Sequence, residues 1–240
     1  MTGIKVAMKW LCIAAVLLCR STPSGWLRAQ GADPNLLLEA AALRTEIARS
    51  TAALRQYGWT EQTEVLVGGS VKSLDSFTCR FDASGKLLRT LLDNDKRIDS
   101  GRATSNRPTV RGKADLRDYI ERSVSRIHDY APPQPELIDH VLQNGQVSFA
   151  QTADGKSAIR LTRYYIDGDS YVFTYDSKSK VLLSATVASS LGSPKDPVTL
   201  EAVFETLPDG VNHISSAVLT AKKKSVLVRM RNLDYHKVAP

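Results

Sequence analysis

The chain has 240 residues, of which 42% are hydrophobic, and it carries 32 Lys and Arg residues against 25 Asp and Glu residues. That length can bury one sizeable core, or at most two small ones. Three cysteines are too few for a small fold that disulfide bonds hold together. We therefore expect a protein that is stabilised by its own hydrophobic core.

The first 29 residues have the order of charged, apolar and small residues that is typical of a secretory signal peptide. Lys5 and Lys9 precede an apolar run from Trp10 to Cys19, and the small residue Ala29 follows a polar stretch. The run is roughly half of the ~20 residues that a membrane-spanning helix needs. We therefore predict that residues 1–29 are cleaved, that the mature protein is periplasmic or secreted, and that it is not an integral membrane protein.

Cleavage of the signal peptide changes the net charge and the cysteine content of the mature protein. It removes four basic residues and no acidic ones, which leaves 28 basic against 25 acidic residues and a net charge of +3. So small an excess argues against nucleic-acid binding. Cys12 and Cys19 leave with the segment, so Cys79 remains without a partner for an internal disulfide. Lipidation at Cys19 is an alternative, although Leu18 is not the small residue expected before a lipidated cysteine.

We expect residues 30–240 to form a single β-rich domain that begins with a helix. Apolar residues recur every three to four positions from Asn35 to Tyr57, which predicts that helix. Residues 93–113 are polar and have no period, which predicts a mobile surface loop. Between the helix and the loop, alternating apolar residues predict strands at Trp59–Val67, Val71–Asp82 and Lys86–Leu92.

The second half of the chain begins with two helical segments and continues as strands and turns. Pro132 and Pro133 separate the two helical segments, which predicts a helical hairpin at 114–144. Strands are predicted at 147–151, 157–165, 170–175, 181–191, 198–206, 213–221 and 225–233. The predicted fold class is therefore α+β: a curved, mainly antiparallel sheet, or half-open barrel, of about ten strands. The N-terminal helix and the helical hairpin would cover this sheet.

No set of residues has the spacing of a catalytic or metal site. The sequence has no glycine-rich phosphate loop and no nucleophile elbow. The histidines are not spaced as metal ligands: His128, His140, His213 and His236. A hydrolase is the weakest alternative, since it would need His128, Asp129 and a serine in one cleft. We expect no enzyme, no metal and no cofactor.

Two further chemical features have simple structural explanations. Cys79 alternates with Phe77 and Phe81, which indicates a core residue rather than a reactive thiolate. The carboxylates of Glu61 and Glu64 are expected on the polar, solvated face of a strand.

The order of elements resembles the half-open β-barrels of the periplasmic lipoprotein carriers and receptors of the Lol system. Residues 196–233 also resemble exported bacterial proteins of uncharacterised function. The resemblance implies an apolar cavity between the sheet and the helices, in which acyl chains rest. Apolar residues on the expected inner faces of strands are the candidate lining: Val65, Val67, Phe77, Phe81, Phe173, Tyr175, Phe204 and Met230.

These observations favour an exported, non-enzymatic binding protein that carries a lipid or another apolar ligand between sheet and helices. The alternative is a structural or protein-interaction module of the cell envelope, with a filled core and no small-molecule ligand. Small inward-facing residues such as Ala185, Ala202 and Thr220 support a filled core. The module would bind an envelope protein through a strand edge or the 93–113 loop. Neither hypothesis includes nucleic acid as a partner.

Overall fold

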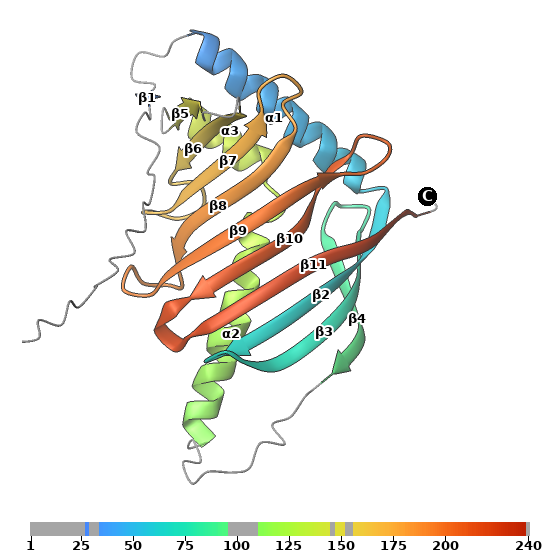
Figure 1. The fold of residues 1–240 in the computed structure, drawn as a ribbon, viewed down its shortest axis with the longest axis vertical. Helices are drawn as coiled ribbons and strands as arrows, with labels where there is room; N and C mark the ends of the chain where they lie inside the picture. The colour runs from blue at the N-terminus through green and yellow to red at the C-terminus, as the bar shows by residue number, and fades with distance from the viewer. Residues whose placement is uncertain (1–26, 29–33, 96–109, 145–146, 152–155, 239–240) are drawn as a thin grey trace, which may run out of the picture.

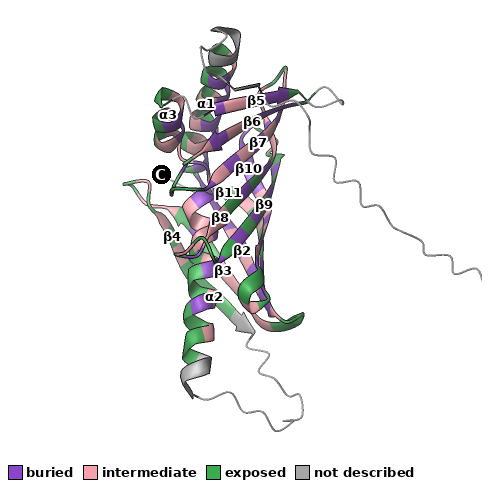
Figure 2. Cartoon of the chain, turned by 90° about the vertical axis from the view of Figure 1, so that its left-hand side faces the viewer, coloured by how far each residue is buried: buried purple, intermediate pink, exposed green. Residues whose placement is uncertain are grey.

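The computed structural model describes residues 27–28, 34–95, 110–144, 147–151 and 156–238. Its strands form one antiparallel sheet, and its three α-helices lie on one side of that sheet (Figures 1 and 2). Within the described residues the sheet ends at β1 and at β4, so the curved sheet does not close into a barrel. The predicted fold class is confirmed. Except for β1, the predicted signal peptide lies outside the described residues.

The elements follow the predicted order along the chain. The helices are α1 (Pro34–Leu54), α2 (Val110–Tyr130) and α3 (Pro135–Gln143), with a short 3-10 helix at Lys222–Lys224. The first strands are β1 (Leu27–Arg28), β2 (Tyr57–Val67), β3 (Ser70–Phe81) and β4 (Leu87–Asp95). The later strands are β5 (Val147–Gln151), β6 (Lys156–Thr162), β7 (Ser170–Asp176), β8 (Leu182–Ser190), β9 (Pro197–Thr206), β10 (Asn212–Ala221) and β11 (Val226–Lys237).

One long-range pairing sets the order of strands in the sheet. That order is β1-β5-β6-β7-β8-β9-β10-β11-β2-β3-β4, so every neighbour except β1–β5 and β11–β2 is joined by a hairpin. The last strand, β11, pairs antiparallel with β2, from Val226 opposite Val67 to Lys237 opposite Tyr57. The hairpins of β2, β3 and β4 thereby extend the sheet that β5 to β10 begin. We call β2–β4 the N-terminal wing.

The three helices cover different parts of the sheet. α1 packs against α3 and β10, α3 also packs against β6, and α2 packs against β10 and β11. Figure 2 shows all three helices on the same side of the sheet. Strand alternation sends one face toward them: in β9, Val198, Leu200, Ala202 and Phe204 are buried while the residues between them are exposed. The helical pair predicted at 114–144 is present as α2 and α3.

The predicted loop at 93–113 is too long at both ends. β4 continues to Asp95, because Asp93, Asn94 and Asp95 pair with residues of β3 despite their polar side chains. α2 begins at Val110. Backbone pairing with a formed neighbour outweighs the low strand propensity of these residues. Residues 96–109 lie outside the described residues.

A buried aspartate ties the end of α2 to the turn between β6 and β7. Asp169 is 2% exposed and accepts a hydrogen bond from the Tyr130 hydroxyl at 2.6 Å. It also accepts the backbone N–H groups of Tyr164, Tyr165 and Ile166, at 2.7, 2.8 and 3.0 Å. Buried carboxylates need such partners, because an unpaired buried charge is costly. This aspartate therefore fixes where α2 ends over the sheet.

Replacing Asp169 by Asn tests this anchor. The amide offers one acceptor oxygen in place of two, so at least one buried N–H or O–H loses its partner. We expect Asp169→Asn to lower the free energy of unfolding by about 2 kcal/mol or more, as measured by urea denaturation. Asp167→Asn is the matched control, because the Asp167 side chain is 95% exposed in the same turn. Equal stabilities of the two variants would contradict the anchor.

Candidate functional site

A groove of about 390 Å³ lies between α2 and the inner face of the N-terminal wing. Small-molecule sites in proteins commonly occupy roughly 300–1,000 Å³. The sheet contributes six residues to its wall and α2 contributes five: Thr63, Val65, Ser73, Asp75, Phe77, Arg89, Ile120, Glu121, Val124, Ser125 and His128. The groove is therefore large enough for a ligand, and its wall combines apolar and charged side chains.

The register of the wing places these side chains on one face. Thr63 lies opposite Asp75, and Val65 lies opposite Ser73, across β2 and β3. Arg89 of β4 lies opposite Cys79 of β3. Because side chains in a strand alternate between faces, the odd-numbered residues from 59 to 65 of β2 all point toward α2.

The buried carboxylate of Glu61 forms an ion pair with the partly exposed Arg89 in the wall between sheet and helix. Glu61 is 2% exposed, and its carboxylate accepts a hydrogen bond from the Arg89 guanidinium. The Thr63 hydroxyl donates to the same carboxylate at 3.0 Å. The sequence-based placement of Glu61 on a solvated face is therefore wrong. The alternation that begins at Trp59 sends Glu61 inward, and the pairing with Arg89 offsets the loss of hydration.

Cys79 lies beside this ion pair as a protonated thiol. It is fully buried, and its Sγ lies 4.0 Å from a carboxylate oxygen of Glu61. Burial, together with the negative charge of Glu61, raises the pKa of Cys79 to about 12. A thiol with so high a pKa is a poor nucleophile at neutral pH. Cys79 is therefore a core residue, as predicted.

His128 of α2 separates the groove from a smaller inner pocket. Its Nε2 lies 3.9 Å from Oε1 of Glu61, and burial lowers its pKa more than the nearby carboxylate raises it. The inner pocket, of about 40 Å³, is mainly apolar: Leu54, Trp59, Glu61, Phe81, Leu87, His128, Ala131, Pro132, Ile214, Met230, Asn232 and Tyr235. His128 lines both spaces and Glu61 lines the inner pocket beside it, and we call these two residues the polar partition.

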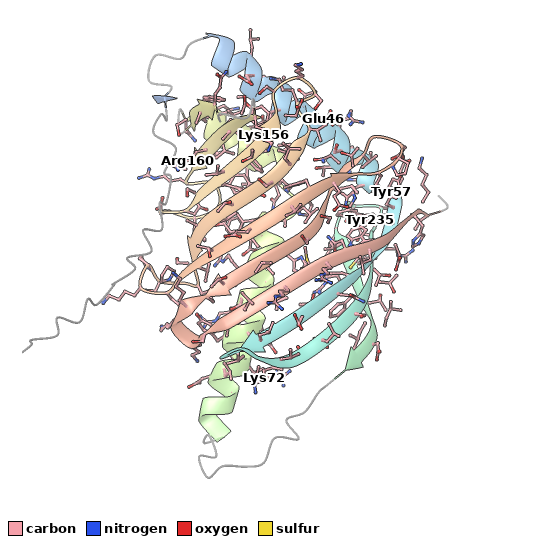
Figure 3. All side chains as sticks on the ribbon, viewed as in Figure 1. Glu46, Tyr57, Lys72, Lys156, Arg160 and Tyr235 are labelled. Carbon is pink, nitrogen blue, oxygen red and sulfur yellow. The ribbon has the colours of Figure 1, made fainter. Side chains whose placement is uncertain are left out.

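Aromatic rings form one wall of the inner pocket. The rings of Trp59 and Tyr235 stack with their centroids 5.5 Å apart, and Phe81 lies 5.6 Å from Trp59. Figure 3 shows Tyr235 beside Tyr57, at the end of the sheet where β2 begins and β11 finishes. The aromatic wall therefore depends on the pairing of β2 with β11.

Four buried polar atoms around these two spaces have no hydrogen-bond partner among the described residues. Arg89 Nε and Asp75 Oδ1 belong to residues that line the groove. Trp59 Nε1 and Asn232 Oδ1 belong to residues that line the inner pocket. Native proteins leave few buried polar atoms unpaired. Each of these atoms has almost no exposed surface, so a molecule in either space could reach it only after the surrounding side chains moved.

Four of the eight predicted lining residues border the groove or the inner pocket, and four do not. Val65 and Phe77 line the groove, and Phe81 and Met230 line the inner pocket. The others lie elsewhere. Phe173 and Tyr175 are fully buried in the core that the helices fill, Val67 packs against that core, and Phe204 lines a small space between α1 and β10.

The sequence did not predict that Glu61, Arg89 and His128 lie together at this site. Strict alternation from Trp59 would have placed Glu61 inside, and alternation in Lys86–Leu92 would have placed Arg89 beside Leu87 and Leu91. No local pattern relates His128 to either residue, because α2 reaches them only through the tertiary fold.

The arrangement of His128 with Asp129 that the hydrolase alternative requires is not formed. Asp129 pairs with Arg126 at 3.0 Å, so the carboxylate next to His128 in space is Glu61. Among the described residues, no three His, Cys, Asp or Glu side chains are grouped so that they could hold a metal ion. None of the described helices is both long and apolar enough to cross a membrane.

A second groove, of about 410 Å³, lies on the other side of α2. Several of its polar groups form hydrogen bonds with one another. The Tyr119 hydroxyl donates to Asp196 at 2.8 Å, and the Lys224 ammonium donates to the backbone oxygen of Asp115 at 3.0 Å. Lys223 lies 3.7 Å from Asp196. This second groove has internally paired charges, in contrast to the groove at the N-terminal wing.

No protein-family model matches the chain, and no curated protein matches its sequence. Among the solved structures that match the chain, three illustrate the similarity, which extends over most of the chain. A DUF1329 family protein from Desulfovibrio piger is 10% identical, over 82% of this chain and 92% of its own, with a TM-score of 0.41. A LolA superfamily protein from Nitrosomonas europaea is 11% identical, over 82% and 94%, with a TM-score of 0.40. A putative outer membrane lipoprotein-sorting protein domain from Vibrio parahaemolyticus is 12% identical, over 80% and 91%, with a TM-score of 0.41.

Breaking the buried ion pair should destabilise the protein strongly. Arg89→Met leaves the Glu61 carboxylate buried without its cation, so we expect a loss of roughly 3–5 kcal/mol in the free energy of unfolding. Adding Glu61→Gln to this variant should recover most of the loss, because the uncompensated charge is removed. Glu64→Gln is the control on the outer face of β2, where an exposed pair with Arg229 should contribute about 1 kcal/mol or less. A double variant as unstable as Arg89→Met would contradict this account.

Stability should also fall in mildly acidic solution. His213 is 5% exposed, and burial lowers its pKa below the unfolded value of about 6.5. Its contribution to stability is therefore complete above about pH 6.5 and is lost as the pH falls toward the lower folded-state pKa. Denaturation at about pH 7.5 and at about pH 5 gives the decrease in the free energy of unfolding between the two conditions. We expect this decrease to be smaller for His213→Gln than for the wild type. His140→Gln, on an exposed helix face, should behave like the wild type.

Proposed function

We propose that this protein is an exported, non-enzymatic binding protein that holds a lipid or another apolar ligand in the groove between α2 and the N-terminal wing. The observation that carries the proposal is a groove of about 390 Å³ with apolar walls from both sheet and helix. Val65 and Phe77 supply the sheet wall, and Ile120 and Val124 supply the helix wall. The inner pocket continues the space past His128.

The energetics favour a ligand with a long apolar chain. Each methylene that leaves water contributes about 0.8 kcal/mol. Association costs about 4 kcal/mol or more in lost translational and rotational freedom. A chain of about ten buried methylenes contributes ~8 kcal/mol, which is above the lower bound of that cost, while a chain of fewer than about five contributes less than that bound.

The sequence supports a periplasmic or secreted location for this binding protein. The signal-peptide pattern of residues 1–29 points to export, and the modest net charge after its removal fits an apolar ligand better than nucleic acid. A lipid, or a cell-envelope protein that delivers one, is the proposed partner.

A bulky residue at the mouth of the groove tests the proposal. Ser125 is exposed on α2 and lines the groove. We expect Ser125→Trp to reduce the binding of a polarity-sensitive dye at least tenfold, and to reduce the lipid that native mass spectrometry detects on protein purified from the periplasm. Arg117→Trp, on an exposed position of the same helix, should change neither measurement. If the wild type binds no dye and carries no lipid, the proposal fails.

One observation favours the second candidate, a protein-interaction module. β4 ends the sheet within the described residues, and two of its apolar side chains, Leu91 and Leu92, are 50% and 60% exposed. An unpaired strand edge can accept a strand from a partner. Under this candidate, Leu92→Lys would abolish capture of a partner protein while the groove stayed without ligand.

A further inference from the structure

We propose that one end of the sheet docks on an anionic lipid bilayer, through lysines at the tips of three hairpins. The hairpins are β2–β3, β8–β9 and β10–β11. We call their tips, together with residues 114–122 of α2 beside them, the basic end. The choice of a lipid bilayer rests on the proposed function and goes beyond it, because it names the surface from which a ligand would be taken up.

The strand order brings the three hairpin tips to the same end of the sheet. The β8–β9 and β10–β11 turns lie together because β9 leads away from that end and the antiparallel β10 returns to it. β2 finishes where β11 begins, with Val67 opposite Val226, so the β2–β3 turn lies there too (Figure 1). The backbone N–H of Gly68 donates to the backbone oxygen of Ser225 at 2.9 Å, which joins two of the tips directly.

The charge of these tips is carried by lysines. The one carboxylate in the three tips, Asp196, is only 3% exposed and accepts the Tyr119 hydroxyl. Figure 3 shows Lys72 at the end of the sheet where β2 finishes and β3 begins. Five lysines occupy the tips, and each is exposed or half-buried: Lys72, Lys195, Lys222, Lys223 and Lys224.

The neighbouring part of α2 reduces this charge without cancelling it. Residues 114–122 carry two arginines and three carboxylates. One of these carboxylates, Glu121, pairs with Arg117 at 2.9 Å. Together with the five lysines and Asp196, the basic end has seven basic and four acidic residues, a net charge of +3. Clusters of basic residues are attracted to membranes that contain anionic lipids.

An apolar side chain at the same end favours a bilayer over a soluble polyanion. Val71 lies at the start of β3, directly before Lys72, and is 37% exposed. At a membrane surface the apolar group can leave water while the lysine ammonium groups stay among the lipid phosphates. A soluble polyanion would pair with the lysines and leave Val71 in water.

The groove of the proposed function begins beside the basic end. Val65 and Ser73 line it and lie opposite each other, close to the β2–β3 hairpin. On the helix side, Ile120 lines the groove and follows Tyr119, whose ring centroid lies 5.2 Å from the Lys224 ammonium. A bilayer docked at the basic end would therefore lie at one end of the groove.

Cosedimentation with vesicles tests the inference on the protein purified from the periplasm. We expect binding to vesicles of phosphatidylglycerol and phosphatidylcholine, in a ratio of about one to three, to be about tenfold tighter or more than binding to phosphatidylcholine alone. This binding should be lost at ~1 M salt, where the Debye length is ~3 Å. Equal binding to both kinds of vesicle, or binding to heparin with none to anionic vesicles, would overturn the inference.

A variant with fewer lysines locates the surface. It combines three substitutions of exposed residues at the basic end: Lys195→Gln, Lys222→Gln and Lys223→Gln. Its affinity for anionic vesicles should fall about tenfold or more, because three cations no longer reach the lipid phosphates. The matched control replaces three exposed lysines at the other end of the sheet and should bind like the wild type: Lys86→Gln, Lys156→Gln and Lys178→Gln. A basic-end variant that binds as tightly as the wild type contradicts the assignment.

Dye binding separates this inference from the proposed function. The three substituted lysines do not line the groove, so the basic-end variant should bind the polarity-sensitive dye like the wild type. If the wild type binds the dye but not anionic vesicles, the inference is wrong while the proposed function stands. If it binds neither, both are wrong. The comparison of vesicles on the wild type decides the inference independently if the triple variant does not fold.

Discussion

The ladder between β2 and β11 joins strands from opposite ends of the described chain, and the groove beside α2 depends on it. Ten residue pairs register these strands, with one irregularity between Leu233 and His236. Without this ladder, β2, β3 and β4 would form a separate set of hairpins, which would have no helix to face. With it, the inner face of β2 lies under α2, and the groove, the polar partition and the aromatic wall all form. Such long-range pairing is entropically demanding, because a long segment must be ordered before the contacts form.

The buried ion pair shows that stability alone does not explain this part of the molecule. Removing two charges from water costs several kcal/mol per ion, and apolar residues of similar size often give a protein that is as stable or more so. The core beneath β6–β9 follows that simpler solution with Phe173, Val187 and Leu200. The N-terminal wing instead buries Glu61 with Arg89 and keeps open space beside them. Within one sheet, the wing thus places a charged pair beside open space, whereas the strands β6–β9 face a core of packed apolar side chains.

The sequence predicted what depends on local periodicity and missed what depends on distant contacts. Alternation in Val198–Phe204 identified the buried face of β9 correctly, since each inward residue is apolar. The same rule applied to β2 would have placed Glu61 inside, but a charged residue is so rarely buried that its polarity decided the prediction. Its partner Arg89 lies on another strand, and His128 lies on a helix, so no local pattern signals that they meet. Likewise, the polar end of β4 is a strand because β3 pairs with it.

The spaces next to the polar partition are not equivalent. His128 lines both the wide groove and the narrow, mainly apolar inner pocket, and these two spaces differ in both size and chemistry. A charged group would lose its hydration in the inner pocket, whereas an apolar group would lose none, so the two spaces favour different chemical groups.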